Sequence, residues 1–208
     1  MLIPKKEILV KLYTEQKRSA FEVGSFLHTS EGKVNYWLKK YTIPKRSISE
    51  ATYAKRNPKG DPFHFHPPKT LHEAFLYGMG LGLYWGEGNK RNKLSVRLGN
   101  SDPELLKTFI TFLKSTYAIN PTKLRFGLQI FSDISPRQAV KFWSEALAVP
   151  KESFHKVIIT ETRGKGSYRY KSQNGVLTVY FNNKKLRDII CQAIENIDGT
   201  LLKVHKPM

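Results

Sequence analysis

A glycine-rich apolar run over residues 76 to 88, LYGMGLGLYWGEG, constrains this chain more than any other segment. It is apolar like a buried helix, yet each glycine costs a helix about 1 kcal/mol relative to alanine, so packing must offset that cost. Gly78, Gly82 and Gly86 recur every four residues and would form one smooth stripe that a second backbone can approach closely. The helix then stops at the final glycine, which leaves the carboxylate of Glu87 at the end of the stripe.

A second copy of the same helix is one candidate partner for this stripe. A two-fold axis would then bring two Glu87 carboxylates together, and a divalent metal site can be built in this way from one acid per chain. The alternative is a glycine-rich helix that packs inside a monomer.

The same segment resembles the LAGLIDADG motif of homing endonucleases. The nine motif positions fall on residues 80 to 88, with the first half matching more loosely than the second. The positions that match well are Gly82, Leu83, Gly86, Glu87 and Gly88. Glu stands where the motif has Asp, which keeps the charge and lengthens the arm by one methylene. One motif copy is half a site, so the resemblance implies a homodimer.

The resemblance also implies a fold and a set of site residues. The fold is α+β, with a LAGLIDADG-like domain over residues 70 to 208 in which helices cover a four-stranded, mainly antiparallel sheet. Glu87 is the implied metal ligand, the carbonyl of Gly86 is the implied assisting ligand, and Mg²⁺ or another divalent cation is the implied cofactor. A polar strand residue and a basic residue commonly surround the metals of such enzymes, and Gln129 and Lys156 are the candidates from their strand positions.

The charge of the chain indicates a polyanionic partner. Lys and Arg number 35 against 17 Asp and Glu, a formal net charge of +18. Residues 1 to 70 carry 14 basic and 6 acidic side chains, and residues 71 to 208 carry 21 and 11. With 40% hydrophobic residues, neither half is typical of a disordered basic tail, so nucleic acid is the natural partner. A membrane surface is less suited, because we find no apolar run of about 18 residues.

Cys191 is the only cysteine and lies within an apolar helical pattern, so we interpret it as a buried structural thiol. This excludes disulfides within the chain and zinc sites built on several cysteines. Residues 1 to 6 lack an apolar signal-peptide core, which favours an intracellular, cytoplasmic protein associated with DNA.

Residues 1 to 56 carry the pattern of three short helices. The first spans about 5 to 16, the second 19 to 27 with Ser19 as its N-cap, and the third 30 to 40 with Ser30 as its N-cap. The residues expected to point inward from the second and third helices are Ala20, Val23, Phe26, Leu27, Val34, Trp37 and Leu38. This arrangement resembles a helix-turn-helix DNA-binding domain, with 30 to 40 as the recognition helix. The alternative is a generic three-helix bundle with a solvated charged face.

Candidate DNA contacts follow from both resemblances. The first residues of a recognition helix meet base edges, and nearby cations meet phosphates. The base candidates are Ser30, Glu31, Lys33 and Asn35, and the phosphate candidates beside them are Lys39, Lys40, Lys45 and Arg46. In the second module the phosphate candidates are Arg97, Lys123, Arg125, Arg163, Lys165, Arg169 and Lys171, with Tyr168 and Tyr170 as stacking residues. Simple solvation is the alternative for the basic loop at 163 to 171.

Prolines and glycine interrupt any helix between residues 57 and 69, so we predict a linker there. His64 and His66 alternate with phenylalanines, and we expect packing or phosphate contact from them rather than metal binding. The elements predicted after the linker are a helix at 70–87, a strand at 94–98, a helix opening at 101–103, a strand at 124–131, a helix at 136–147, a strand pair formed by 154–162 and 175–181, and a helix at 184–196.

Three functions are compatible with these patterns. The first is site-specific binding and metal-dependent cleavage of double-stranded DNA by a homodimeric homing-type endonuclease. The second is a non-catalytic transcriptional regulator on a LAGLIDADG scaffold, as in bacterial sporulation regulators that combine LAGLIDADG-like and helix-turn-helix domains. The third is an RNA-binding or intron-splicing factor, as among LAGLIDADG maturases, although a helix-turn-helix favours duplex DNA.

Overall fold

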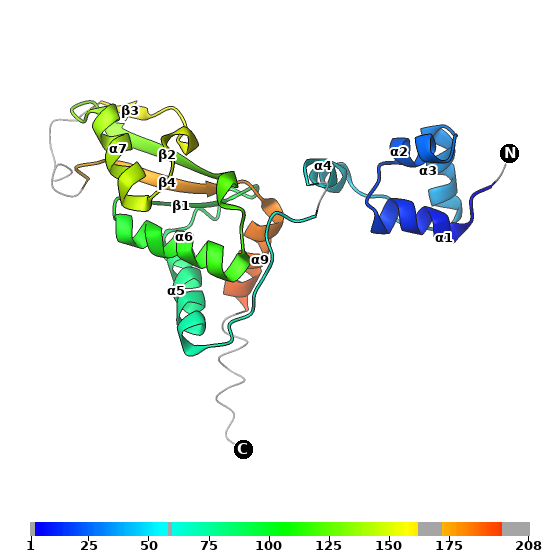
Figure 1. Ribbon diagram of the computed structural model, residues 1–208, viewed down its shortest axis with the longest axis horizontal. Helices are drawn as coiled ribbons and strands as arrows, with labels where there is room; N and C mark the ends of the chain where they lie inside the picture. Colours follow the sequence, from blue (N-terminus) through cyan, green and yellow to red (C-terminus); the bar gives the residue numbers. More distant parts are fainter. Residues whose placement is uncertain (1–2, 58–59, 162–171, 197–208) are drawn as a thin grey trace, which may run out of the picture. The chain divides into compact units, whose positions relative to one another are not determined.

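The computed structural model describes residues 3–57, 60–161 and 172–196 (Figure 1). The chain divides into two compact units, Met1–Pro62 and Phe63–Met208. This boundary falls inside the stretch that the sequence marks as a linker. No helix in the described ranges is long and apolar enough to cross a membrane.

The first unit is entirely helical. Its elements are α1 (Lys6–Leu9), which continues as the π-helix η1 (Val10–Glu15), then α2 (Ala20–Phe26), α3 (Glu31–Lys40) and α4 (Ile48–Arg56). The first three helices share a buried core made of Leu9, Leu12, Tyr13, Val23, Val34, Trp37, Leu38 and Ile43. The inward positions predicted for the third helix are therefore confirmed.

A tight turn joins α2 to α3. Ser19 caps α2 in a reciprocal capping box with Glu22, and the Ser30 hydroxyl accepts from the backbone N–H of Lys33 at the start of α3. Between them Gly24 is buried, and a Cβ there would lie 2.8 Å from the carbonyl oxygen of Thr29. Only glycine lets the turn pass this close to the helix, so Gly24 allows the tight connection between α2 and α3.

Two features of this unit differ from the sequence-based expectation. Phe26 was predicted to point inward, but it is 55% exposed and lies under the Arg18 guanidinium at 4.8 Å. The prediction was wrong because helical spacing marks a wide apolar arc, and the short α2 buries only part of it. The helix α4 was not predicted, although Ser47 and Glu50 form a second capping box at its start.

The second unit is α+β. Its elements are α5 (Leu71–Glu87), β1 (Val96–Asn100), α6 (Pro103–Tyr117), η2 (Pro121–Lys123), β2 (Leu124–Phe131), α7 (Pro136–Leu147), η3 (Lys151–Ser153), β3 (Ile158–Thr160), β4 (Val176–Phe181) and α9 (Lys184–Glu195). Local signals fix the helix starts. For α6 the sequence offers Ser101 or Asp102 as the N-cap, and in the structure Asp102 takes this position, with Pro103 as the first helical residue.

The sheet is four-stranded and mixed, in the order β1-β4-β2-β3. β4 is antiparallel to both β1 and β2, whereas β3 runs parallel to β2. The predicted strand pair between 154–162 and 175–181 is therefore wrong. After β2 the chain crosses over through α7, and the backbone N–H of His155 donates to the carbonyl of Phe126. This contact directs β3 to the free edge of β2, while β4 enters between β1 and β2.

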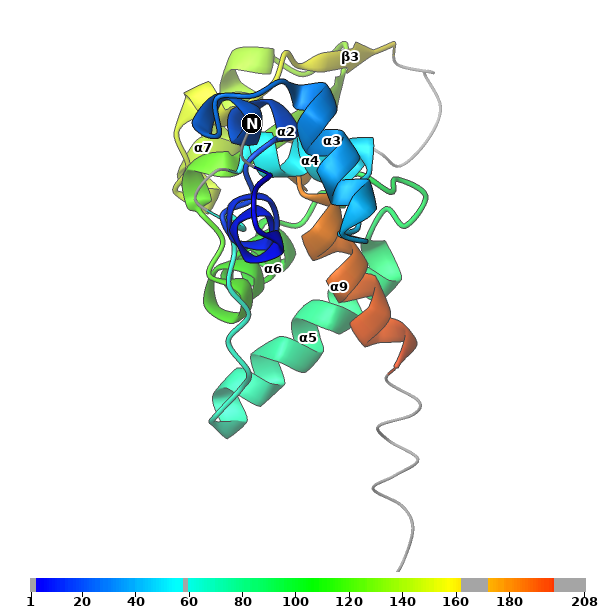
Figure 2. The same cartoon turned by 90° about the vertical axis from the view of Figure 1, so that its right-hand side faces the viewer.

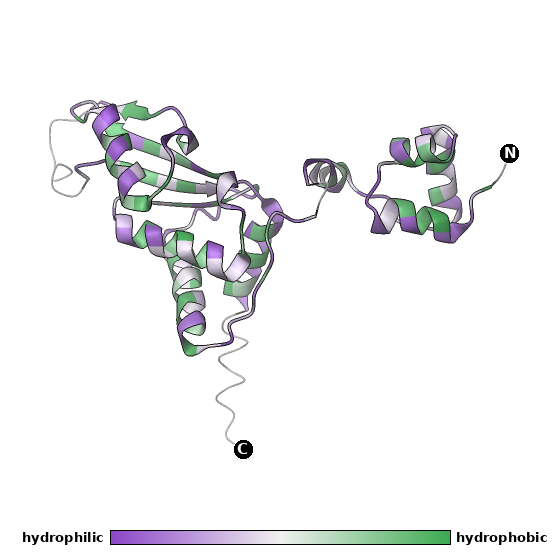
Figure 3. Cartoon of the chain, viewed as in Figure 1, coloured by the Kyte–Doolittle hydropathy of each residue, from purple (hydrophilic) through white to green (hydrophobic). Residues whose placement is uncertain are grey.

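The two faces of the sheet differ in character. Alternate residues of β1, β2 and β4 are almost fully buried on the side where α5 and α6 lie, and the residues between them are partly exposed (Figure 1). Both kinds of residue appear as bands along the strands in Figure 3. The strap before α5 also belongs to this unit, because Phe63 is buried and the N–H groups of His64 and His66 donate to carbonyls at the end of α6.

Candidate nucleic-acid interface and dimer surface

The outer face of α5 is apolar and open. Leu71 is 91% exposed, Phe75 65% and Trp85 56%, and at helical spacing they lie on one arc with the predicted glycine stripe. A Cβ built on Gly78, Gly82 or Gly86 would meet no atom of the described residues within 4 Å. The stripe is therefore not packed inside the described part of this chain.

The opposite face of α5 carries the contacts with the core. Tyr84 is fully buried and stacks on Phe109 at 5.9 Å, and a Cβ on Gly80 would lie 2.1 Å from the Phe112 ring. Burial raises the pKa of the Tyr84 hydroxyl, so this group is neutral at physiological pH. The glycine that the monomer needs is thus Gly80, which is not a member of the stripe.

Gly88 ends α5 and directs the chain toward the sheet. Its N–H donates to the Tyr84 carbonyl, and a Cβ at this position would lie 2.3 Å from that same oxygen. Gly88 also forms an isolated bridge with Leu98 of β1. Glu87 is exposed at this end of the helix, next to the first strand, and it follows the last glycine of the stripe by one residue.

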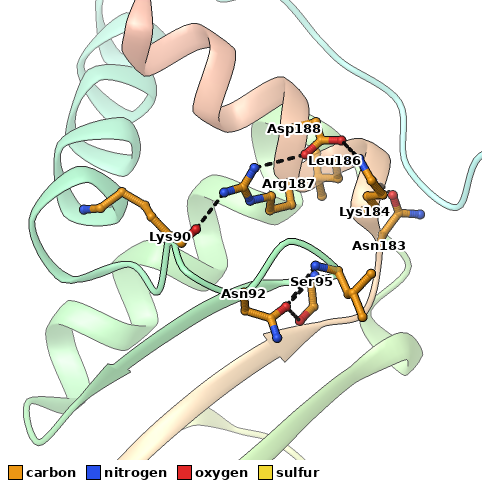
Figure 4. A network of polar contacts seen from close by, with 9 residues as sticks. Lys90, Asn92, Ser95, Asn183, Lys184, Leu186, Arg187 and Asp188 are labelled. Carbon is orange, nitrogen blue, oxygen red and sulfur yellow. Dashed lines mark hydrogen bonds and ion pairs between the residues drawn. The ribbon is translucent and has the colours of Figure 1, made fainter.

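A polar loop connects Glu87 to β1 (Figure 4). The Asn92 side-chain oxygen accepts from the N–H groups of Leu94 and Ser95 and from the Ser95 hydroxyl. From α9, which crosses α5 near its C-terminal end (Figure 2), Arg187 donates to the Lys90 carbonyl at 2.8 Å. The loop is therefore held from both sides.

Two further contacts complete the support of this loop. Burial raises the pKa of the Asp188 carboxyl, but hydrogen bonds from Lys184 and Arg187 outweigh it and lower the pKa overall. The Lys90 ammonium donates to the carbonyl of Trp85, one of the carbonyls that the end of α5 leaves without a helical partner. Sequence reasoning did not find Asn92 or Arg187, since each acts through contacts that only the fold creates.

The exposed face of the sheet presents basic and aromatic side chains in register. Arg97 of β1 lies opposite Tyr180 of β4, which lies opposite Arg125 of β2. The next row consists of Gly99, Thr178 and Gly127. The predicted alternation of Arg125, Gly127 and Gln129 on one side of β2 is confirmed, because Arg125 and Gly127 are partly exposed, Gln129 is exposed, and the residues between them are buried.

Tyr180 lies across the sheet rather than standing up from it. A Cβ on Gly127 would lie 2.8 Å from its ring, so the glycine makes room for the phenol. The Arg97 guanidinium carbon lies 5.0 Å from the ring centroid, and the His155 ring meets the same tyrosine edge-on at 5.8 Å. These three side chains form one surface, which we call the Tyr180 shelf. No local pattern predicts this shelf, because its members come from three distant segments.

The structure does not bring the two auxiliary catalytic candidates next to Glu87 in the same chain. Glu87 adjoins β1 at one edge of the sheet, whereas Lys156 lies beside β3 at the opposite edge. Gln129 lies on β2, and its side-chain nitrogen donates to Thr160 at 3.1 Å. Two strand spacings and three residues separate Gln129 from Leu98, or about 14 Å.

In the first unit, the predicted contact residues lie on the outer side of α3. Glu31, Lys33 and Lys39 are exposed and Asn35 is partly exposed, while the Ser30 hydroxyl serves as the N-cap. Arg46, one of the predicted phosphate contacts, also makes contacts within the unit. Its guanidinium lies over the Tyr13 ring at 4.4 Å and donates to the carbonyls of residues 17 and 18.

Of the remaining DNA-contact candidates in the second unit, the structure describes Lys123. Lys123 is exposed at the end of η2. The residues Arg163, Lys165, Tyr168, Arg169, Tyr170 and Lys171 lie outside the described residues.

At the end of α5, the exposed carboxylate of Glu87 is the candidate ligand for a divalent ion. Among the described residues, no three Asp, Glu, His or Cys side chains gather closely enough to hold a metal. Carboxylate and backbone carbonyl oxygens suit Mg²⁺, which is commonly held by one or two carboxylates plus phosphates. The donor set at Glu87 and Gly86 therefore fits such an ion only when a second copy supplies the matching acid.

Comparison with known proteins gives no assignment: no family model, no curated protein and no solved structure matches this chain.

Proposed function

We propose that this chain binds specific sites on double-stranded DNA as a homodimer joined along α5, and that its paired Glu87 side chains support metal-dependent cleavage of the LAGLIDADG type. The observation that carries the proposal is the outer face of α5, which is apolar, open and smooth at backbone level. A monomer gains nothing from such a face, because it exposes large side chains to water and places glycines in a helix.

The dimer follows from what can fill this face. Burying Leu71, Phe75 and Trp85 against a second copy removes apolar surface from water, which stabilises association by about 25 cal/mol per Å². The missing side chains at Gly78 and Gly82 let two helix backbones come close enough for extended van der Waals contact. The same axis would bring together the two ends of α5 that carry Glu87.

Binding to DNA is supported by the exposed face of the sheet, which is basic where the outer face of α5 is apolar. Arg97, Tyr180 and Arg125 form a row across β1, β4 and β2, and the exposed Lys123 adds charge just before β2. Together with a net charge of +18 per chain, this face suits a polyanion that also offers base edges. The first unit supplies a second contact through the outer side of α3.

The acids at the dimer axis would hold a magnesium-type ion through Glu87, with the Gly86 carbonyl beside it. Such an ion, when bound, polarises a phosphoryl oxygen and makes water a better nucleophile at neutral pH. The chain's own part is to fix this end of α5: Gly88 turns the backbone toward β1, and Lys90 and Arg187 hold the following loop.

The proposed activity is tested by incubating the wild-type dimer with a randomised duplex DNA library in Mg²⁺ and sequencing the cut ends. We expect cleavage of both strands at one family of sites. Glu87→Gln should abolish cleavage and leave affinity for the selected site unchanged or improved, since a negative charge next to phosphate is removed. Glu73→Gln, at the other end of α5, is the matched control and should still cut.

A transcriptional regulator is the second candidate, favoured by the single acid at the end of α5 and by the Lys90 ammonium that already serves the adjacent carbonyl. It predicts tight binding of the selected site with no cleavage in Mg²⁺ or Mn²⁺. That result would remove the nuclease proposal and keep the DNA-binding one.

The contribution of the first unit is tested separately. Asn35→Ala should change which sequences are selected at flanking positions, because this residue is partly exposed in the N-terminal half of α3. Lys39→Ala should weaken all sequences alike and reduce the salt dependence of binding. Equal losses on every sequence from both variants would contradict the role of α3 as a recognition helix.

A further inference from the structure

Arg97 is held on the exposed sheet face more firmly than a surface arginine usually is. Its Nε donates to the Ser95 hydroxyl at 2.7 Å. That hydroxyl donates to the Asn92 side-chain oxygen at 3.0 Å (Figure 4). Ser95 is only 1% exposed, so this support is anchored in the protein interior. The Tyr180 ring, 5.0 Å from the guanidinium carbon, restrains the other side.

The two terminal nitrogens of Arg97 are not used by this support. Within the described residues, neither of them donates to a protein acceptor. A guanidinium that is fixed through Nε and stacked on an aromatic ring presents its two outer N–H groups side by side, in a defined direction. The cost of ordering this side chain is therefore met before any ligand arrives.

Arg125 provides the internal comparison, because it flanks Tyr180 on the other side in the same row. Its Nη1 donates to the carbonyls of Thr122 and Leu124, both at 2.7 Å. One of its two outer nitrogens is thus committed to the protein backbone. The two arginines share their charge and their row, but among the described residues only Arg97 keeps both terminal nitrogens clear of protein acceptors.

We propose that Arg97 is a specificity-determining residue that recognises one guanine in the major groove, through two hydrogen bonds to O6 and N7, with Ser95 and Asn92 as its positioning residues. The proposal rests on the DNA-binding function proposed above. Guanine is the base that offers two adjacent acceptors on its major-groove edge, and the planar fork of arginine matches them. Arg125 is assigned to phosphate contact instead.

The test begins with duplexes selected by the wild-type protein from a randomised library. At one position of each half-site we expect a guanine whose replacement weakens binding about 5- to 150-fold. Replacing that guanine with 7-deazaguanine removes the N7 acceptor and should weaken wild-type binding by several-fold. The same replacement should have no effect on Arg97→Ala, since the partner of N7 is already absent.

Arg125→Ala is the matched control, because it removes the same charge from the same row of the sheet. It should weaken all sequences alike and remain sensitive to 7-deazaguanine. The proposal is overturned if wild-type binding is insensitive to 7-deazaguanine at every guanine, or if Arg97→Ala and Arg125→Ala change selection in the same way. A wild-type protein that binds no duplex would instead contradict the proposed function itself.

Ser95→Ala separates positioning from simple structure. It leaves the arginine in place and removes the group that fixes its direction. We expect affinity for sites that lack the guanine to be unchanged, while the preference for guanine and the sensitivity to 7-deazaguanine both fall. An equal loss of affinity on all sequences would show that Ser95 serves the fold alone, and would remove it from the recognition site.

Discussion

The two faces of α5 carry the same residue type for opposite reasons. On the inner face, the missing side chain of Gly80 lets the Phe112 ring lie against the helix backbone. On the outer face, the space beside Gly78, Gly82 and Gly86 is not filled by any neighbour among the described residues. Packing within the monomer explains the inner glycine. The outer glycines lower the stability of the helix in the monomer, and we attribute their presence to contact with a partner.

Gly80→Ala has the largest expected effect on stability. A Cβ at this position would lie 2.1 Å from the Phe112 ring, which is itself fully buried among aromatic neighbours. We expect a loss of about 3 kcal/mol in the free energy of unfolding, the upper part of the range for overpacked cores. Denaturant unfolding followed by tryptophan fluorescence measures it. A variant as stable as the wild type would mean that α5 and α6 are not packed in this way.

Gly82→Leu tests the outer face and should leave the monomer folded. The new side chain has open space within the chain but would hold two facing helices apart. We expect the dimer dissociation constant to rise by roughly 100-fold, since overpacking a close contact costs about 1 to 3 kcal/mol. Sedimentation equilibrium measures it, with circular dichroism as the check on folding. A wild-type protein that is monomeric, both alone and on DNA, would show that the outer glycines of α5 do not serve a dimer contact.

These two glycines also show what the sequence can and cannot reveal. The spacing of residues 78, 82 and 86 predicted a smooth stripe, but the same pattern allowed the stripe to face the monomer core or a partner. Gly80 lies in the same run with no local mark of its inner role. Only the position of Phe112, more than thirty residues away, distinguishes them.

Elements with local causes were predicted well. Ser19 and Ser30 cap their helices as predicted, because capping depends on residues within one turn. For α6 the sequence left Ser101 and Asp102 as candidates, and Asp102 is the cap. The strand pairing of segments 154–162 and 175–181 was predicted wrongly, because pairing is decided by contacts between residues far apart in the chain. The Tyr180 shelf was missed for the same reason, although Arg97 and Arg125 had been chosen as basic residues of the two strands.

Gly78→Ala should stabilise the monomer, whereas Gly80→Ala on the inner face should destabilise it. Nothing in the described residues opposes a methyl group at this position, and alanine is favoured over glycine in a helix by about 0.5 to 1 kcal/mol. The measurement is best made in the Gly82→Leu background, where the dimer no longer contributes to stability. A loss of stability there would indicate that the outer face is packed within the chain after all.

The smallest expected effect comes from the two acids at opposite ends of α5. At the start, Glu73 accepts from the N–H groups of Lys69 and Thr70, and these bonds lower the pKa of its carboxyl below the ordinary 4.5. Its contribution to stability is therefore present above pH 4.5 and is lost as the pH falls through the lowered pKa. At the other end, Glu87 adds a negative charge where the helix dipole is already negative.

Opposite signs are thus expected from one chemical change. Glu73→Gln should lower the thermal midpoint at pH 7 and flatten its decline between pH 6 and pH 3. Glu87→Gln should raise the midpoint at pH 7, because relief of an unfavourable helix-end charge is worth about 0.3 to 1 kcal/mol at low salt. The gain should shrink in 0.5 M NaCl. If Glu87→Gln instead destabilises the protein, a contact within the folded chain holds the carboxylate. A role in binding an ion alone would then no longer explain why an acid lies at that end of the helix.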